Sequence, residues 1–363
     1  MASIQRVAGF DIGTNSLRVL IADVDSLSRI VAGLRLGFAV RLGEGLSETG
    51  RVSETALERT SRVLGKSTLL ARRLGTSRML AGATHALRVA TNSAEVVNDL
   101  EKAAGLPINI LTPEEEAYYI YTGVLSDSFF TALPNAFRSA SPGTSPGGSR
   151  PASPGGVAGV ASTGAGATVG EGAFEGGFVI DVGGGSTTLI EGSGTGIVRS
   201  STLPLGCVTL TERFLKHDPP ASEELRALGD HIMTELSQAQ SVPLSQVRPL
   251  LLPEAQVPVT GVGGAVTSIA AVSLGLPYYE SRRVEGHILT RDEIEHCAQQ
   301  LSRLPLEERE KIRALGRRRA EIAVAGAFIL SLLTCHLNVR RVTVSTRGLR
   351  YGLALEAAAH PAG

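Results

Sequence analysis

The chain of 363 residues contains no tryptophan and only three cysteines, and aromatic residues make up 4% of it. Cys207, Cys297 and Cys335 lie far apart without metal-ligand spacing, so they predict buried thiols, with neither a disulfide framework nor a zinc site. This cysteine usage predicts a cytoplasmic location. No apolar run is long enough to cross a bilayer, and the first ten residues lack the apolar core of a secretory signal.

Charge of one sign is not in excess either, since 35 basic residues balance 35 acidic residues. A chain without net charge has no global field that attracts nucleic acid or a membrane, and we expect neither as a partner. A polyanionic ligand would have to be held by local groups. Hydrophobic residues make up 43% of the chain, which predicts a globular protein long enough for two domains.

Large apolar side chains are nearly absent from residues 139–172, which consist mostly of Ser, Pro, Gly, Ala and Thr. A segment of this composition cannot bury enough surface to offset the entropy of ordering it. We predict a disordered insertion over residues 139–177, and composition favours a passive linker over a docking or regulatory segment.

Outside this insertion, strand and helix patterns alternate. The first 45 residues predict three strands, and Ser53 is the expected N-cap of a helix over residues 53–74. Further strand and helix patterns follow over residues 78–92, 107–125, 178–192, 256–275, 320–337 and 340–358. This order predicts an α/β chain with mixed sheets.

Two distant segments have the same layout. In VAGFDIGTNSLRVLIADV, residues 7–24, Asp11 ends an apolar run and a polar turn leads into a second strand. In FVIDVGGGSTTLIEG, residues 178–192, Asp181 takes the same place. Glycines at such turns lower strand stability unless something must approach the main chain closely. We therefore expect the two segments to form two halves of one site.

The chemistry of these turns suits a phosphate and a divalent cation. Backbone N–H groups in a glycine turn can bind phosphate oxygens, and Asp11 and Asp181 can hold Mg²⁺ or Mn²⁺ directly or through water. A single turn of this kind could equally be a tight hairpin with a capping aspartate, but a third glycine turn at TGVGGAVTS strengthens the hypothesis. The expected substrate-binding residues are Gly13, Thr14, Asn15, Ser16, Gly183, Gly184, Gly185, Ser186, Thr187, Gly263 and Gly264.

This arrangement resembles the actin/Hsp70/sugar-kinase superfold, and within it the exopolyphosphatase/guanosine pentaphosphate phosphatase (Ppx/GppA) family. The resemblance rests on FDIGTNSLRVLIADV, VRLGEGL, ATHALRVATN, EEEAYYIYTGV, VIDVGGGSTTLIEG, LPLGCVTLTERF, TGVGGAVTSIAAV, EGHILTRDEIE and VSTRGLRYGLAL. It implies two RNase H-like domains with a phosphate-binding cleft between them. We expect residues 1–125 with 347–363 in one domain and residues 126–346 in the other, in a short form without an HD-like C-terminal domain.

The resemblance also implies an activity and two catalytic residues. The implied reaction is Mg²⁺-dependent release of orthophosphate from the end of inorganic polyphosphate. The alternatives are removal of the 5′ γ-phosphate of guanosine pentaphosphate, a weakly catalytic binder of either compound, and, less favoured, a kinase. Arg88 matches the phosphate-binding arginine of the family and Glu116 the glutamate that activates water. Helical spacing alone does not choose among Glu114, Glu115 and Glu116, and the motif register chooses Glu116.

Some residues depart from the family pattern or have open roles. Thr346 and Glu321 stand where the family commonly has Asp, which bears on substrate preference or domain closure. His85 is as consistent with a hydrogen-bonded structural histidine as with a substrate contact. Arg317–Arg319 is more typical of a solvated helix start than of a polyanion site, although a homodimer groove that includes it would be one way to hold long chains.

Overall fold

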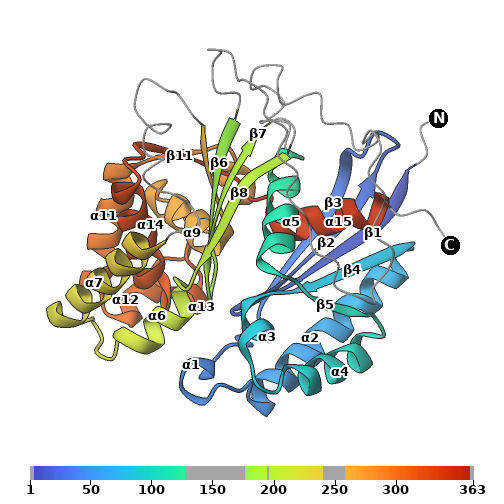
Figure 1. Ribbon diagram of the computed structural model, residues 1–363, viewed down its shortest axis with the longest axis horizontal. Helices are drawn as coiled ribbons and strands as arrows, with labels where there is room; N and C mark the ends of the chain where they lie inside the picture. The colour runs from blue at the N-terminus through green and yellow to red at the C-terminus, as the bar shows by residue number, and fades with distance from the viewer. Residues whose placement is uncertain (1–3, 127–175, 194–195, 240–257, 360–363) are drawn as a thin grey trace.

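The computed structural model describes residues 4–126, 176–193, 196–239 and 258–359, which form two β-sheets with helices on both faces of each (Figure 1). The first sheet has the strand order β3-β2-β1-β4-β5 and the second β10-β11-β9-β6-β7-β8. The sequence prediction of an α/β chain with mixed sheets is therefore confirmed. None of the helices in these ranges is long and apolar enough to cross a membrane.

The first sheet contains the strands β1 (Gln5–Ile12), β2 (Ser16–Val24), β3 (Ile30–Ala39), β4 (Arg78–Ala83) and β5 (Ile108–Ile110). The first three strands form an antiparallel meander, and β4 and β5 continue from β1 in parallel. Side chains of β1 alternate between two cores. Ala8, Phe10 and Ile12 pack toward the helices α2 (Glu54–Arg73) and α4 (Ser93–Ala104), and Val7 packs toward α15 (Leu349–Ala359). Burial on both faces explains why β1 reads as a continuous apolar run.

The second sheet repeats this order. Its strands are β6 (Gly176–Val182), β7 (Thr187–Ser193), β8 (Gly196–Leu203), β9 (Val259–Val262), β10 (Ile288–Thr290) and β11 (Arg341–Val344). Strands β6, β7 and β8 form the antiparallel meander, and β9 and β11 follow in parallel. Asp11 and Asp181 thus occupy equivalent places, each at the next-to-last position of its sheet's first strand. The duplication expected from the two matching segments is present in the strand order.

The outer face of the second sheet is covered by several helices whose apolar faces form one large core. These helices are α6 (Cys207–Phe214), α7 (Ser222–Gln238), α9 (Gly263–Ser273), α11 (Arg291–Arg303) and α14 (Ala323–His336). The shorter helices are α1 (Leu46–Thr49), α3 (His85–Val89), α10 (Ser281–Val284), α12 (Leu306–Lys311) and α13 (Arg317–Ala320).

A central layer of two helices, α5 (Pro113–Leu125) and α15, lies between the sheets (Figure 1). One core cluster joins Ile120 of α5 and Leu353 of α15 to Val179 of β6, and α15 also packs on β1 and β4. Gly9 of β1 lies against α15, and Val179 of β6 packs in the core of the central layer. Alternate residues of a strand face the same side, so Asp11 and Asp181, two residues further along, also face this layer. The start of α5 therefore comes close to both aspartates.

The predicted insertion lies almost wholly outside the described residues. Its expected end is corrected by the structure: Gly176 and Gly177 already pair with Ser193 and Gly192 of β7. The glycine content of this stretch concealed its strand, because glycine carries no side chain to show the alternation of a strand. The division of the chain into residues 1–125 with 347–363 and residues 126–346 stays a prediction.

Two glycines allow α5 and α15 to pack closely. A Cβ at Gly352 would clash with the backbone carbonyl of Tyr119 and lie 2.6 Å from its Cα. A Cβ at Gly123 would likewise lie 3.1 Å from the carbonyl carbon of Gly348. Main chain meets main chain at this contact, so neither helix can yield by moving a side chain.

We expect Gly352→Ala to lower the free energy of unfolding by about 1–3 kcal/mol, because overpacking outweighs the better helix propensity of alanine. Gly229, inside α7, is the matched control, since its added Cβ would meet only Leu332 Cδ1 at 3.8 Å. Gly229→Ala should raise the free energy of unfolding by about 0.5–1 kcal/mol. Urea denaturation measures both, and equal stability of the two variants would contradict the close packing of α5 on α15.

Candidate active site

A cavity of about 440 Å³ opens where the strand ends of the two sheets meet the central layer. All three predicted glycine turns line it: residues 13–16, residues 183–186 and the pair Gly263 and Gly264. Asp11, Asp181, His85 and Glu116 line the same cavity. The structure therefore brings together most of the residues that the sequence singled out.

The two hairpin turns touch each other directly. Each closes on itself in the same way, with Gly13 N donating to Ser16 O at 3.0 Å and Gly183 N to Ser186 O at 2.9 Å. A Cβ at Gly184 would lie 3.1 Å from Thr14 Cβ and 3.2 Å from Asn15 N. Glycine at this position is required because the backbones of the two turns meet there.

The third turn, between β9 and α9, closes the floor of the cavity. Gly263 adopts a φ of 93°, a left-handed conformation that favours glycine, and a Cβ there would clash with the Asp181 carboxylate. A Cβ at Gly264 would lie 2.6 Å from an Nη atom of Arg18. The bare backbone of this turn therefore makes room for two charged side chains.

Burial dominates the electrostatics of the two carboxylates, Asp11 and Asp181, at this meeting point. Burial raises the pKa of Asp11 above its usual range, and the charges of Arg18 and Arg350 only partly offset this. Burial raises the pKa of Asp181 to about 6, and the charge of Asp11 contributes to the rise. Within the described part of the chain, no group donates a hydrogen bond to either carboxylate.

These two residues fit a magnesium ion. Mg²⁺ is usually held by one or two carboxylates, with water and substrate phosphates completing its shell. No cluster of three or more His, Cys, Asp or Glu side chains that could hold a metal ion occurs among the described residues. Asp11 and Asp181 offer the open, two-carboxylate kind of site, and a bound cation would remove the cost of holding both charges in the same buried place.

Glu116, in the first turn of α5, is only 8% exposed and faces the cavity. Both terminal nitrogens of Arg88 bind its Oε2 at 2.9 Å, and Arg88 Nη1 also donates to Leu111 O at 2.7 Å. Burial raises the pKa of Glu116 to about 7; the Arg88 contact lowers it, and the nearby charges of Asp181 and Asp11 raise it. A carboxylate that titrates near neutral pH can serve as a general base.

The neighbouring glutamates have different surroundings. Glu115 belongs to a capping box, in which its N–H donates to Thr112 Oγ1 at 3.2 Å and its carboxylate accepts from Thr112 N at 2.9 Å. Glu114 is exposed at the same helix start. Of the three, only Glu116 faces the cavity.

Two predicted site residues do not line the cavity. Arg88 lies behind Glu116, and Thr187 points to the other side of its hairpin. Thr187 is fully buried and donates its hydroxyl hydrogen bond to Leu205 O at 2.6 Å. Its neighbour Ser186 does line the cavity. Their roles stay predictions, but the side chains of Arg88 and Thr187 already have partners within the fold.

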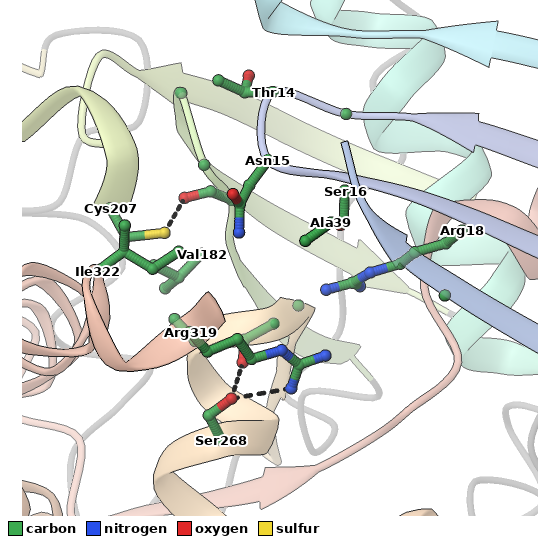
Figure 2. A pocket seen from close by; sticks show the side chains of 18 of the residues that line it. Thr14, Asn15, Ser16, Arg18, Ala39, Val182, Cys207, Ser268, Arg319 and Ile322 are labelled. Carbon is green, nitrogen blue, oxygen red and sulfur yellow. Dashed lines mark hydrogen bonds between the residues drawn. The ribbon is translucent and has the colours of Figure 1, made fainter. Parts of the chain in front are cut away.

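Four arginines line the cavity: Arg18, Arg317, Arg319 and Arg350. Sequence reasoning missed Arg18 and Arg350, and it favoured a solvated helix start for Arg317–Arg319. Figure 2 shows the guanidinium groups of Arg18, from β2, and Arg319, from α13, directed into the same space. Ser268 of α9 accepts a hydrogen bond from Arg319 Nη1 at 2.9 Å, which helps to hold this side chain. Burial lowers the pKa of Arg350 to about 10, so it remains charged at neutral pH.

A weak signal for these arginines was available in the sequence. Arg18 follows the first polar turn by two residues, and Arg350 lies inside the motif VSTRGLRYGLAL. Arg319 belongs to the run Arg317–Arg319, whose other described side chain, that of Arg317, is largely exposed and forms an ion pair with Glu310 at 3.1 Å.

The two departures from the family pattern, Glu321 and Thr346, each contact another segment of the fold. Glu321, after α13, forms an ion pair with Arg41 at 2.7 Å and so links the segment after β3 to the second sheet's helices. Thr346 follows β11, where its N–H donates to the carboxylate of Glu285 at 3.0 Å and its hydroxyl contacts the same carboxylate. Both residues have structural partners, and neither lines the cavity.

Comparison with known proteins gives consistent likenesses. Residues 20–133 and 161–360 match the Ppx/GppA phosphatase family. Exopolyphosphatase 2 of Mycobacterium tuberculosis is 28% identical over 98% of this chain and 99% of its own length. The crystal structure of the Aquifex aeolicus Ppx/GppA family member is 28% identical, with a TM-score of 0.68 over 99% of this chain and 100% of that one.

A further solved structure bears on the fold alone. An exopolyphosphatase from Cytophaga hutchinsonii has a TM-score of 0.74 at 21% identity, over 96% of this chain and 96% of that one. Together with the repeated strand order of the two sheets, these likenesses confirm the actin-like superfold expected from the sequence.

Proposed function

We propose, because this chain belongs to the Ppx/GppA phosphatase family, that it hydrolyses the terminal phosphoanhydride bond of inorganic polyphosphate and releases orthophosphate. The observation that carries this proposal is the position of Glu116. Its buried carboxylate faces a cavity lined by three glycine turns and by Asp11 and Asp181. This is the arrangement that phosphoryl transfer to water needs: groups that hold the phosphate, and a base beside it.

The chain's own residues account for the main parts of the reaction. The two hairpin turns offer backbone N–H groups to the terminal phosphate. Arg18, Arg319 and Arg350 provide fixed positive charge for the phosphates that follow. Glu116, which titrates near neutral pH, takes the proton of the attacking water. Mg²⁺ held by Asp11 and Asp181 would neutralise charge on the phosphate oxygens.

A second candidate substrate, guanosine pentaphosphate, is favoured by one observation. Part of the cavity wall is apolar and includes Phe38, Ile269, Leu301, Leu315 and Ile322. Polyphosphate has no apolar part to place against these side chains, whereas a nucleoside does. Removal of the 5′ γ-phosphate would use the same glycine turns and the same base.

We expect the purified chain to release orthophosphate from polyphosphate in the presence of Mg²⁺ without any acceptor. The assay should be run beside guanosine pentaphosphate, with kcat/KM determined for both compounds. A higher kcat/KM for guanosine pentaphosphate, reduced selectively by Phe38→Ala, would support the second candidate. Binding without release would identify a binder, and release that requires an acceptor would identify a kinase.

A further inference from the structure

Helix α3 carries two polar side chains one turn apart, and they have different surroundings. His85, at its start, lines the cavity, whereas Arg88 does not. The motif that contains both residues had assigned the phosphate contact to Arg88. The structure thus raises the question of which side chain of this turn meets the substrate.

Arg88 is already bound on its terminal nitrogens. Its Nη1 donates to Leu111 O at 2.7 Å and to Glu116 Oε2 at 2.9 Å, and its Nη2 lies 2.9 Å from the same oxygen. These contacts tie Arg88 to the carboxylate that takes the proton, and Arg88 does not line the cavity. These contacts fit a residue that holds Glu116 in place.

His85 has the opposite surroundings. Its ring packs so closely against the second hairpin turn that a Cβ added at Gly185 would clash with it. The same added Cβ would lie 2.8 Å from Thr14 Oγ1 of the first hairpin turn. The ring is partly buried, and neither of its nitrogens has a hydrogen-bond partner within the described ranges 4–126, 176–193, 196–239 and 258–359. Neither nitrogen is one of the buried side-chain atoms left without a partner in these ranges, so both are accessible to solvent. This ring packs on Gly185 of the second hairpin turn and lines the cavity.

The protonation state of His85 is also defined. Burial and the charge of Arg88 lower the pKa of His85 to about 4, so the ring is neutral at pH 7. A neutral imidazole has one N–H donor and one acceptor nitrogen. It can bind a phosphate oxygen without bringing a further charge into a cavity that four arginines already line.

We propose that His85 is the substrate-contacting side chain of α3, donating a hydrogen bond to a nonbridging oxygen of the phosphate held between the two hairpin turns, and that Arg88 is a positioning residue for Glu116. The identity of the anion rests on the proposed function. The assignment of the two roles rests on the different surroundings of the two side chains: His85 lines the cavity, and Arg88 binds Glu116 and the Leu111 carbonyl.

The test uses the whole chain with Glu116 unchanged, in buffer containing Mg²⁺. The probe for binding is methylenediphosphonate, whose P–C–P bridge resists hydrolysis, titrated by calorimetry. Inorganic tripolyphosphate serves for KM and kcat. His85→Leu removes the N–H but fills the space against Gly185, and His85→Gln returns an N–H donor. Arg88→Met removes the Glu116 contact, and His296→Leu, on the exposed side of α11, is the control for loss of a histidine elsewhere.

A hydrogen bond to a charged group contributes about 1.5–3 kcal/mol, so His85→Leu should raise both Kd and KM by roughly 10–100-fold while kcat stays within about threefold. His85→Gln should recover most of the affinity. Arg88→Met should lower kcat at least about tenfold and change Kd less than threefold. His296→Leu should match the unaltered protein. If His85→Leu does not fold, His85→Ala replaces it.

The inference is overturned if the unaltered protein binds the probe and the His85 variants bind it equally well. It is also overturned if Arg88→Met weakens binding as much as His85→Leu does. If the unaltered protein neither binds the probe nor hydrolyses tripolyphosphate, the proposed function fails and the inference falls with it. That outcome is recognised before any variant is compared.

Discussion

Replacement of Glu116 by glutamine should lower kcat by about 10²–10⁴-fold, the usual loss when a general base is removed. Glutamine keeps the shape of the side chain and can still accept a hydrogen bond from Arg88, but it cannot take a proton from water. Binding of methylenediphosphonate should persist, because the glycine turns and the arginines remain. Steady-state phosphate release, with calorimetry for binding, measures both effects.

The pH profile gives an independent check on the same residue. The base acts only when ionised, and burial raises the pKa of Glu116 to about 7. In the unaltered protein kcat/KM should therefore fall as pH drops through about 7. The residual activity of Glu116→Gln should not show this decrease at low pH. Because the substrate titrates in the same way in both experiments, the difference between the two pH profiles reports Glu116 alone.

Glu115→Gln is the matched control for this substitution. Glu115 caps α5 and is exposed, so its replacement should cost at most about 1 kcal/mol of stability and leave kcat unchanged. Loss of hydrolysis in Glu115→Gln but not in Glu116→Gln would place the base one residue earlier. Full activity of both variants would mean that water is activated elsewhere in the cavity.

Replacement of Asp11 or Asp181 by asparagine should reduce Mg²⁺-dependent hydrolysis by roughly 10²–10³-fold, since charge neutralisation by a metal contributes several kcal/mol to such reactions. The Mg²⁺ concentration for half-maximal activity should also rise. Asp99→Asn, on the exposed side of α4, is the control and should alter neither quantity. Unchanged Mg²⁺ dependence in both active-site variants would contradict the assignment of these residues as ligands.

Asp181→Asn should raise the stability of the metal-free fold although it lowers activity. The folded-state pKa of Asp181, about 6, is higher than the usual value for an exposed aspartate. Because the folded protein holds this proton more tightly, ionising Asp181 destabilises the fold as pH rises from about 4 to about 6, and the cost is complete above that range. In a chelator at pH 8, Asp181→Asn should therefore have a higher Tm than the unaltered protein, and the difference should vanish near pH 3.

Local pattern was sufficient to predict much of this protein. Both hairpins, their aspartates and the glycine turns could be located, because strand alternation and turn chemistry depend on neighbouring residues. The N-cap Ser53 was predicted for the same reason, and its side chain accepts a hydrogen bond from Ala56 N at 3.3 Å. The motif register, which extends over most of the chain, identified Glu116 where helical spacing did not.

What only the tertiary structure decided is the direction of side chains where distant segments meet. Residues 113–125 and 349–359 became a layer between two sheets, and their glycines determine how closely these two helices pack. Arg88 and His85 belong to one motif, yet Arg88 binds Glu116 from behind while His85 faces the cavity. Arg18 and Arg319 share the cavity although most of the chain separates them. Spacing along the sequence specifies which face of its own helix or strand a residue occupies. The partner of that face is set when elements far apart in the chain pack together, because burial, charge and close backbone contact all depend on that packing.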